Sequence, residues 1–128
     1  MERPAFDRLL RELYVARVRG DLDAVCGSFL NDARFEIAGA SRGSPTVVTS
    51  VGLDQFRPLL ALMIKTFKIS EQSILSIIID GEKAAVHWRA TVHSRITGAT
   101  VATELVDLVE VRDDLISSYI EFFVPRQP

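Results

Sequence analysis

Residues 84–96 read AAVHWRATVHSRI, and apolar and polar side chains alternate along this segment with a period of two. The even positions from Ala84 to Ile96 are apolar apart from Ser94, whereas the odd positions carry both histidines of the chain and two arginines. This period is typical of a β-strand that buries one face and leaves the other in water. The segment therefore predicts a strand whose dry face is the even-numbered one, centred on Trp88.

Three more strands are predicted next to this one. Turn sequences at Asp80-Gly81, Thr97-Gly98 and Asp113-Asp114 divide the second half of the chain into apolar, β-branched segments. The predicted strands are 69–80, 84–96, 101–112 and 115–124, and short turns between them favour an antiparallel meander.

The first half of the chain has helical spacing for the most part. Pro4 suits a first helical turn, and a face built from Phe6, Leu9, Leu10 and Leu13, extended by the aliphatic stem of Arg17, would end near Gly20. We further expect a second helix capped by Asp21 that includes Phe29 and ends at Asn31-Asp32, strands at 33–38 and 46–51 around a loop at 39–45, and a helix that begins no earlier than Leu53. Helices first and long strands last predict an α+β fold, with N-terminal helices packed on one face of a curved, mainly antiparallel sheet.

Composition narrows the class of protein. The 128 residues, 48% hydrophobic and 25% charged, have the size and balance of a single domain spanning 1–128. A formal charge of −2 gives no basic field for nucleic acid, and the apolar stretches are far shorter than the ~20 residues of a membrane helix. Met1–Pro4 lacks the apolar core of a signal peptide, and a single cysteine, Cys26, fits a reducing compartment. We therefore expect a cytoplasmic chain with no nucleic-acid or membrane partner.

One ionisable side chain is predicted inside the apolar interior. A two-residue turn at Thr97-Gly98 places Trp88 opposite Asp107, and opposed residues share a face. No cation lies on this face of either strand, so desolvation should raise the pKa of Asp107. A carboxyl group that is neutral near physiological pH can donate a hydrogen bond or exchange a proton. The structural alternative is that buried amides or a water molecule satisfy Asp107 and it does nothing else.

The alternation of side chains also assigns residues of the last strand and of the outer face of the sheet. The last strand is expected to supply Ile116, Ile120, Phe122 and Val124 to the interior. The outer, convex face would carry charges at Arg89, His93, Arg95, Glu104 and Glu110, with Val106, Leu108, Tyr119 and Phe123 among them. This mixture is either solvated surface or a self-complementary homodimer interface, and the exposed apolar group favours the homodimer.

Residues 20–25, GDLDAV, running into residues 29–36, FLNDARFE, resemble the superfamily that includes nuclear transport factor two, steroid isomerases and SnoaL-type polyketide cyclases. The later order, a helix followed by long strands, is similar too, so the resemblance covers nearly the whole chain. It implies a cone-shaped α+β domain with a deep pocket, commonly a homodimer. We expect no cofactor. It implies no single activity, because members include isomerases, dehydratases, epoxide hydrolases, cyclases and non-catalytic binding domains.

The resemblance carries over only in part. Asp107 falls where steroid isomerases keep a protonated aspartic acid, close to the acid/base aspartate of the cyclases. The isomerases' base falls on Ile37, and their helix-one tyrosine on Leu13, one position from Tyr14. An isoleucine cannot shuttle a proton, which argues against steroid isomerisation. Epoxide hydrolases need an arginine inside the pocket, whereas Arg89 is predicted to point outward.

The remaining candidates follow from these positions. Tyr14 either donates a hydrogen bond beside Asp107 in the pocket or only fastens its helix to the sheet. His93 would enter the pocket only through a β-bulge near the turn, as the cyclases' histidine suggests. Two histidines make a metal site unexpected. The catalytic candidates are thus Asp107, Tyr14 and His93, and the candidate pocket residues, which could equally be ordinary core, are Leu13, Phe35, Ile37, Phe56, Met63, Trp88, Ala90, Leu105, Ile120 and Phe122.

Two hypotheses of function follow. In the first, the chain is a SnoaL-like isomerase, cyclase or lyase that binds an apolar carbonyl compound, which could be cyclic, with Asp107 as acid or hydrogen-bond donor. In the second, it is a non-catalytic ligand-binding or dimerisation domain, which Ile37 in place of a base supports. The enzymatic hypothesis requires the Asp107 carboxyl group to be buried beside an open cavity.

Overall fold

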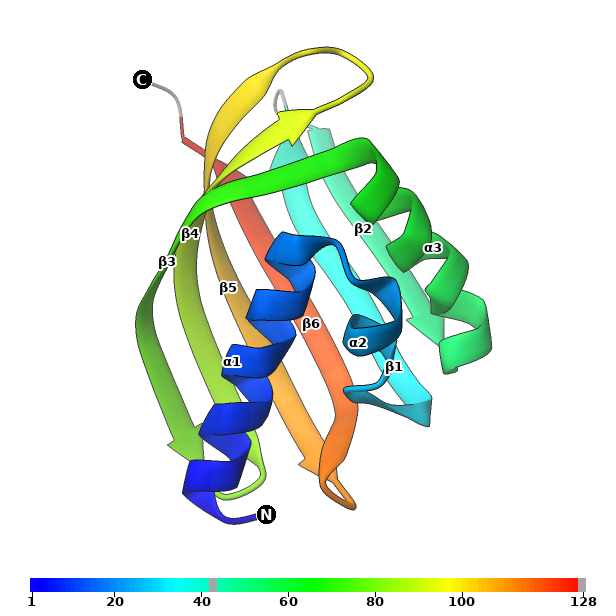
Figure 1. Cartoon of the computed structure of the whole chain (residues 1–128), viewed down its shortest axis with the longest axis vertical. Helices are drawn as coiled ribbons and strands as arrows, with labels where there is room; N and C mark the ends of the chain where they lie inside the picture. The colour runs from blue at the N-terminus through cyan, green and yellow to red at the C-terminus, as the bar shows by residue number, and fades with distance from the viewer. Residues whose placement is uncertain (42–43, 127–128) are drawn as a thin grey trace.

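The computed structural model describes residues 1–41 and 44–126 of the chain (Figure 1). These described residues form three helices and six strands. The elements are α1 (Arg3–Arg19), α2 (Leu22–Cys26), β1 (Phe29–Ser41), β2 (Ser44–Val51), α3 (Leu53–Thr66), β3 (Phe67–Asp80), β4 (Lys83–Ser94), β5 (Thr100–Arg112) and β6 (Leu115–Pro125). Among the described residues, no helix combines the length and the apolar character needed to span a membrane.

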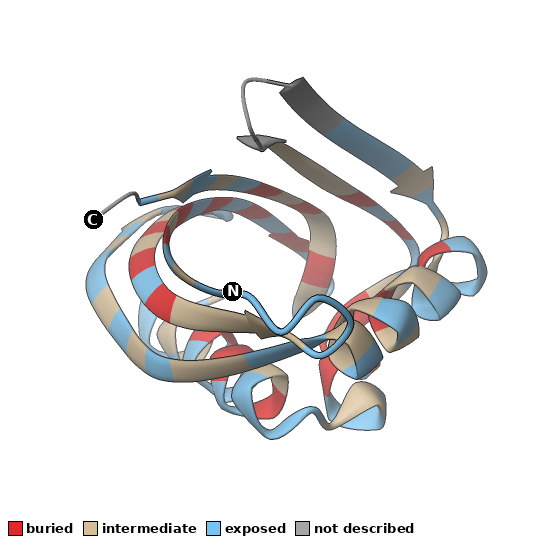
Figure 2. Cartoon of the chain, turned by 90° about the horizontal axis from the view of Figure 1, so that it is seen from above, coloured by how far each residue is buried: buried red, intermediate tan, exposed pale blue. Residues whose placement is uncertain are grey.

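The strands form one curved, open sheet in the order β2-β1-β6-β5-β4-β3. All neighbouring strands are antiparallel except β1 and β6, which are parallel. Figure 2 shows the curl of the sheet from above, with the helices on its open side and buried residues alternating with exposed ones along the strands. The predicted α+β fold and the meander of four long strands are therefore confirmed.

Local chemistry explains where the N-terminal helices begin and end. Pro4 occupies the first turn of α1, and Gly20 ends the helix in the left-handed region at φ 71°. The side chain of Asp21 then accepts a hydrogen bond from the amide of Ala24 and caps α2. The second helix is shorter than predicted, since Phe29 already lies in β1.

The hairpin between β1 and β2 also differs from the prediction. The strands reach Ser41 and begin again at Ser44, so most of the predicted loop at 39–45 is strand, and residues 42–43 lie outside the described part of the chain. Gly39 lies opposite Phe123 on β6, and a Cβ atom at Gly39 would stand 2.5 Å from the Phe123 ring. The missing side chain is what lets this ring pack over β1.

The faces of β4 and β5 are as predicted, but their register is not. The connection between the strands spans 95–99 instead of two residues, so Trp88 faces Leu105, and Asp107 faces Val86. This shift of two positions preserves the side of the sheet to which each side chain points. Trp88, Val86 and Asp107 are all fully buried, which confirms the inward orientation of Asp107.

The faces of β6 are reversed for most of its length by a β-bulge. Val111 pairs with Ile116, whereas Glu110 pairs with Ser118, so the intervening Ser117 is an extra residue on β6. Ile116 is buried as predicted, but beyond the bulge the alternation changes face. The predictions that Ile120, Phe122 and Val124 point inward and that Tyr119 and Phe123 point outward are therefore wrong, because the bulge adds one residue to the period.

Candidate functional site

A pocket of about 760 Å³ opens between the concave face of the sheet and the helices. α3 provides one wall from Leu59 to Thr66, and the opposite wall comes from the inner faces of β1, β4, β5 and β6. This volume lies in the range of sites for drug-sized molecules. Its lining is mostly apolar and includes Ile37, Leu59, Leu60, Met63, Ile69, Trp88, Val92, Leu105 and Phe123.

Four of the ten predicted pocket residues line this cavity: Ile37, Met63, Trp88 and Leu105. Four others are buried in the core, namely Leu13, Phe35, Phe56 and Ala90. The two aromatic ones belong to a cluster in which the Phe35 ring stacks on Phe56 at 5.4 Å and on Tyr119 at 5.9 Å between centroids. The remaining two, Ile120 and Phe122, lie on the outer face because of the bulge in β6.

Asp107 lies behind the pocket wall and is not among the residues that line it. One carboxylate oxygen, Oδ2, accepts hydrogen bonds from the Tyr14 hydroxyl at 2.5 Å, from Trp88 Nε1 at 2.8 Å and from the Tyr119 hydroxyl. The other oxygen, Oδ1, is buried and has no hydrogen-bond partner in the described part of the chain. Tyr14 thus makes the predicted hydrogen bond to Asp107, but it does so in the core and does not line the pocket.

The carboxyl group that lines the pocket belongs to Glu121, the direct neighbour of Asp107 across β5 and β6. Arg17 binds it with both amino groups, through Nη1 to Oε2 at 2.5 Å and Nη2 to Oε1 at 3.2 Å. Nη1 also donates to the Tyr119 hydroxyl at 3.0 Å and lies 3.9 Å from Oδ2 of Asp107. The guanidinium carbon lies 5.1 Å from the centre of the Trp88 ring.

These contacts separate the pKa values of the two carboxyl groups. Burial raises the pKa of Asp107 well above its ordinary value, and the negative charge of Glu121 raises it further. Burial also acts to raise the pKa of Glu121, but the charge and hydrogen bonds of Arg17 outweigh it, and the pKa of Glu121 is lowered. Burial, followed by the charge of Asp107, raises the pKa of both Tyr14 and Tyr119, which keeps them as hydroxyl donors. Glu121, paired with Arg17, is therefore the more acidic of the two carboxyl groups.

The sequence interpretation missed the roles of Glu121 and Arg17. Arg17 was placed on the inner face of α1, where its stem was expected to pack, and Tyr14 and Arg17 are three residues apart, as side chains on one helix face are. No cation was expected near Asp107, because the strands carry none there; the helix supplies it. The sequence gives Glu121 no role, because an uninterrupted alternation along β6 that turns Ile120 and Phe122 inward would turn Glu121 outward.

His93 lies on the outer face of β4, where Nδ1 is 2.8 Å from the Thr100 hydroxyl. It is not among the described residues that line the pocket. The bulge that would have turned His93 inward does not occur, since the pairing of β4 with β5 is regular from Lys83 to His93.

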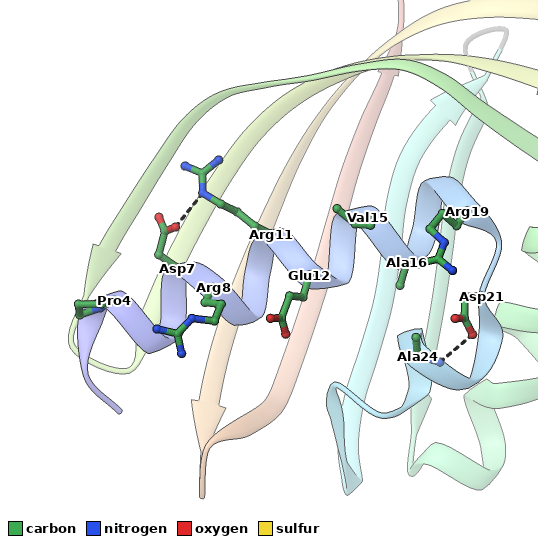
Figure 3. Close-up of a pocket in the computed structure, with 10 residues that line it drawn as sticks. All are labelled: Pro4, Asp7, Arg8, Arg11, Glu12, Val15, Ala16, Arg19, Asp21 and Ala24. Atoms are coloured by element: carbon green, nitrogen blue, oxygen red, sulfur yellow. Dashed lines mark hydrogen bonds and ion pairs between the residues drawn. The ribbon is translucent and has the colours of Figure 1, made fainter.

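A second hollow of about 530 Å³ lies on the outer side of α1 (Figure 3). Its lining is largely charged, with Arg11 donating to Asp7 at 2.7 Å across one helical turn. It does not reach the buried carboxyl groups, since its lining comes from α1, Asp21 and α2 alone.

Comparison with known proteins agrees with this geometry. The family model of the SnoaL-like domain matches residues 10–119. The chain belongs to the SnoaL-like family. A comparison of this SnoaL-like chain with curated proteins finds no match.

Solved structures support the same fold for this SnoaL-like chain. It is similar to a protein from Bacillus subtilis that is proposed to be an isomerase, with a TM-score of 0.80, 18% identity and coverage of 97% of this chain and 90% of that one. An NTF2-like protein from Burkholderia xenovorans gives a TM-score of 0.74 at 20% identity, covering 97% and 92%. An epoxide hydrolase from M. tuberculosis gives 0.70 at 19% identity, covering 91% and 80%. At these identities the likeness concerns the fold alone.

Proposed function

We propose that this SnoaL-like chain is an enzyme of the isomerase, cyclase or lyase kind, which binds an apolar carbonyl compound and exchanges a proton with it through Glu121. The observation that carries the proposal is a pocket of about 760 Å³ with apolar walls and a buried Arg17–Glu121 pair among its lining residues. Apolar walls exclude water from the bound molecule, and the two charged groups provide a base and a stabilising cation in the same place. The likeness to isomerase and epoxide hydrolase structures is compatible with this class.

The proton transfer balances without a further reactant. The C–H bond next to the carbonyl group breaks, the proton moves to an oxygen of Glu121, and the electron pair forms an enolate. Negative charge then leaves Glu121 and appears on the substrate oxygen, so the positive charge of Arg17 stays compensated throughout. Return of the proton to another carbon atom completes an isomerisation.

Asp107 has a positioning role in this proposal, in place of the direct acid role expected from the sequence. Its Oδ2 atom holds the Tyr119 hydroxyl and the Trp88 indole, and both of these contact Arg17. The raised pKa of Asp107 disfavours a second anion beside Arg17, where it would compete with Glu121 for the same guanidinium group.

Deuterium exchange tests the proposal without knowledge of the product. Cyclic ketones that shift the emission of Trp88, the single tryptophan of the chain, are incubated with the protein in D₂O, and deuterium next to the carbonyl group is followed by NMR. We expect exchange to fall at least ~100-fold in Glu121→Gln, with binding retained. Glu110→Gln, an exposed position on β5, is the matched control and should exchange at the wild-type rate. Bound ketones that exchange no faster with the wild type than with Glu121→Gln would refute catalysis.

A ligand-binding domain without catalysis is the second candidate. It is favoured by the two-pronged contact from Arg17, which lowers the pKa of Glu121 and so weakens it as a base. Under this alternative, ketones change the emission of Trp88 but exchange no deuterium.

We also propose that the chain forms a homodimer through the outer face of β5 and β6 and acts in the cytoplasm. Val106 and Leu108, 36% and 43% exposed, lie opposite Phe122 and Ile120 and form a continuous apolar area. Glu104 beside it accepts a hydrogen bond from Arg126 at 2.6 Å, so both charge signs border the area, which suits a self-complementary two-fold interface. Light scattering should give the dimer mass for the wild type and the monomer mass for Leu108→Glu; a monomeric wild type would contradict the dimer.

A further inference from the structure

The chemical class of the ligand can be inferred from the charges around the pocket, an inference that rests on the proposed function. Among the described lining residues, four side chains are basic and one, Glu121, is acidic, although the chain as a whole has a formal charge of −2. Arg17 and Glu121 compensate each other inside the pocket. The three remaining basic residues, Arg19, Lys68 and Arg95, are exposed.

These three residues gather at one end of the pocket, around the C-terminus of α3. Arg95 donates through Nη1 to the carbonyl oxygens of Ile64 at 2.8 Å and Lys65 at 3.2 Å. Lys68 follows the end of α3 by two residues. Arg19 precedes Gly20, whose Cα lies so close to α3 that an added Cβ would stand 3.3 Å from the Ile64 side chain.

No ion pair engages these three residues within the described chain. These three side chains therefore make one end of the apolar pocket positively charged, and no acidic side chain of the described residues pairs with them there. Such a field attracts an anion, and the apolar walls accept a hydrocarbon body.

We propose that the pocket takes an amphipathic anion, with its hydrocarbon body in the cavity and its carboxylate at the rim formed by Arg19, Lys68 and Arg95. The inner end does not compete for the anionic group, because Arg17 already binds Glu121 with both amino groups, and an incoming carboxylate would meet the charge of Glu121. The ligand thus has one orientation, with its less polar end next to Glu121.

Three probes that differ only in the head group test this inference: dodecanoate, dodecanamide and dodecylammonium. Their dissociation constants are measured at low salt from the emission of Trp88, which lines the pocket, and from the shift in thermal midpoint. We expect dodecanoate to bind roughly tenfold more tightly than dodecanamide, with dodecylammonium weakest. The advantage of the carboxylate should shrink as salt is added, because the rim is exposed.

Variants of the rim residues test whether they cause the preference for a carboxylate head group. The double variant Arg19→Gln/Lys68→Gln should reduce the advantage of the carboxylate to less than about threefold and leave the affinity for the amide unchanged. Lys65→Gln removes one positive charge from an exposed residue of α3 that does not line the pocket, and it should retain the wild-type preference, whereas Lys68→Gln, the matched single variant at the rim, should not.

The outcomes separate the two proposals. Equal affinity for carboxylate and amide, tightest binding of the ammonium probe, or an undiminished preference in the double variant would overturn the anionic ligand and leave the pocket's function standing. Failure of all three probes to change either signal would also overturn the anionic ligand, and the proposed function then stands or falls with the exchange of cyclic ketones in D₂O.

Discussion

Asp107 and Glu121 are paired on the neighbouring strands β5 and β6, yet their side chains lie in different surroundings. Asp107 lies at a sealed end, where two tyrosines and a tryptophan donate to one oxygen. Glu121 lies at the open end and lines the pocket with Arg17 beside it. Burial alone would raise both pKa values, so the difference between them depends on where α1 directs its one inner cation. Helix docking thus decides which of the two carboxyl groups has the lower pKa.

Removing the positive charge of Arg17 should have the largest effect on stability. Arg17→Met leaves Glu121 buried without its partner, and we expect the free energy of unfolding to fall by about 3–5 kcal/mol in urea titrations at neutral pH. Arg17→Met/Glu121→Gln should recover most of this loss, because no unpaired charge remains. A single variant that loses less than about 1 kcal/mol would contradict the compensating role of Arg17.

A change at the open end alone should be smaller. Gly39→Ala forces the Phe123 ring away from β1. We expect a loss of about 1–3 kcal/mol from overpacking, together with weaker ligand binding, since Phe123 lines the pocket. The near-UV circular dichroism of Tyr14 and Tyr119 should stay unchanged, because the Phe123 ring is not part of the hydrogen bonds around Asp107.

The pH dependence of stability should have opposite signs at the two ends. The folded pKa of Asp107 is raised, so its contribution is present below its ordinary value of 3.8 and is lost as the pH rises through the folded pKa. The pKa of Glu121 is lowered, so its contribution is present above its ordinary value of 4.5 and is lost as the pH falls through the folded pKa.

Matched amides separate these two contributions. From about pH 4 upward, Asp107→Asn should gain stability relative to the wild type, by at most about 1.4 kcal/mol per pH unit, whereas Glu121→Gln should show no such gain. Urea titrations across this range measure both slopes. A pH-independent difference between Asp107→Asn and the wild type would show that Asp107 has the same pKa folded and unfolded.

The smallest expected effect is a difference in stability between variants of the two tyrosines that donate to Asp107. Tyr14→Phe removes one donor to Asp107, which costs about 1 kcal/mol. Tyr119→Phe also removes the acceptor for Arg17 Nη1 and should cost about 2 kcal/mol. Equal losses in thermal unfolding would mean that the contact between Tyr119 and Arg17 contributes nothing to stability.

The sequence predicts the orientation of Asp107, but it predicts neither the orientation of Glu121 nor the extent of the pocket. The inward orientation of Asp107 follows from strand alternation and survives a turn that is longer than predicted, because the register shifts by two. The orientation of Glu121 does not follow, since Ser117 has no local signal that marks it as a bulge residue. The extent of the cavity depends on how α3 packs, which no local pattern encodes, and so Phe35 and Phe56 were assigned to the pocket although they fill the core.

The sequence separations within the site have a consequence for how the protein is made. Tyr14 reaches Asp107 across 93 positions, and Arg17 reaches Glu121 across 104. On a ribosome, the N-terminal helix therefore emerges long before the strands that it must meet, and the charge of Arg17 stays in water during that interval. The pocket acquires its Arg17–Glu121 pair only once β6 has been made and joins the sheet, and nascent chains that stop short of that strand lack the pair.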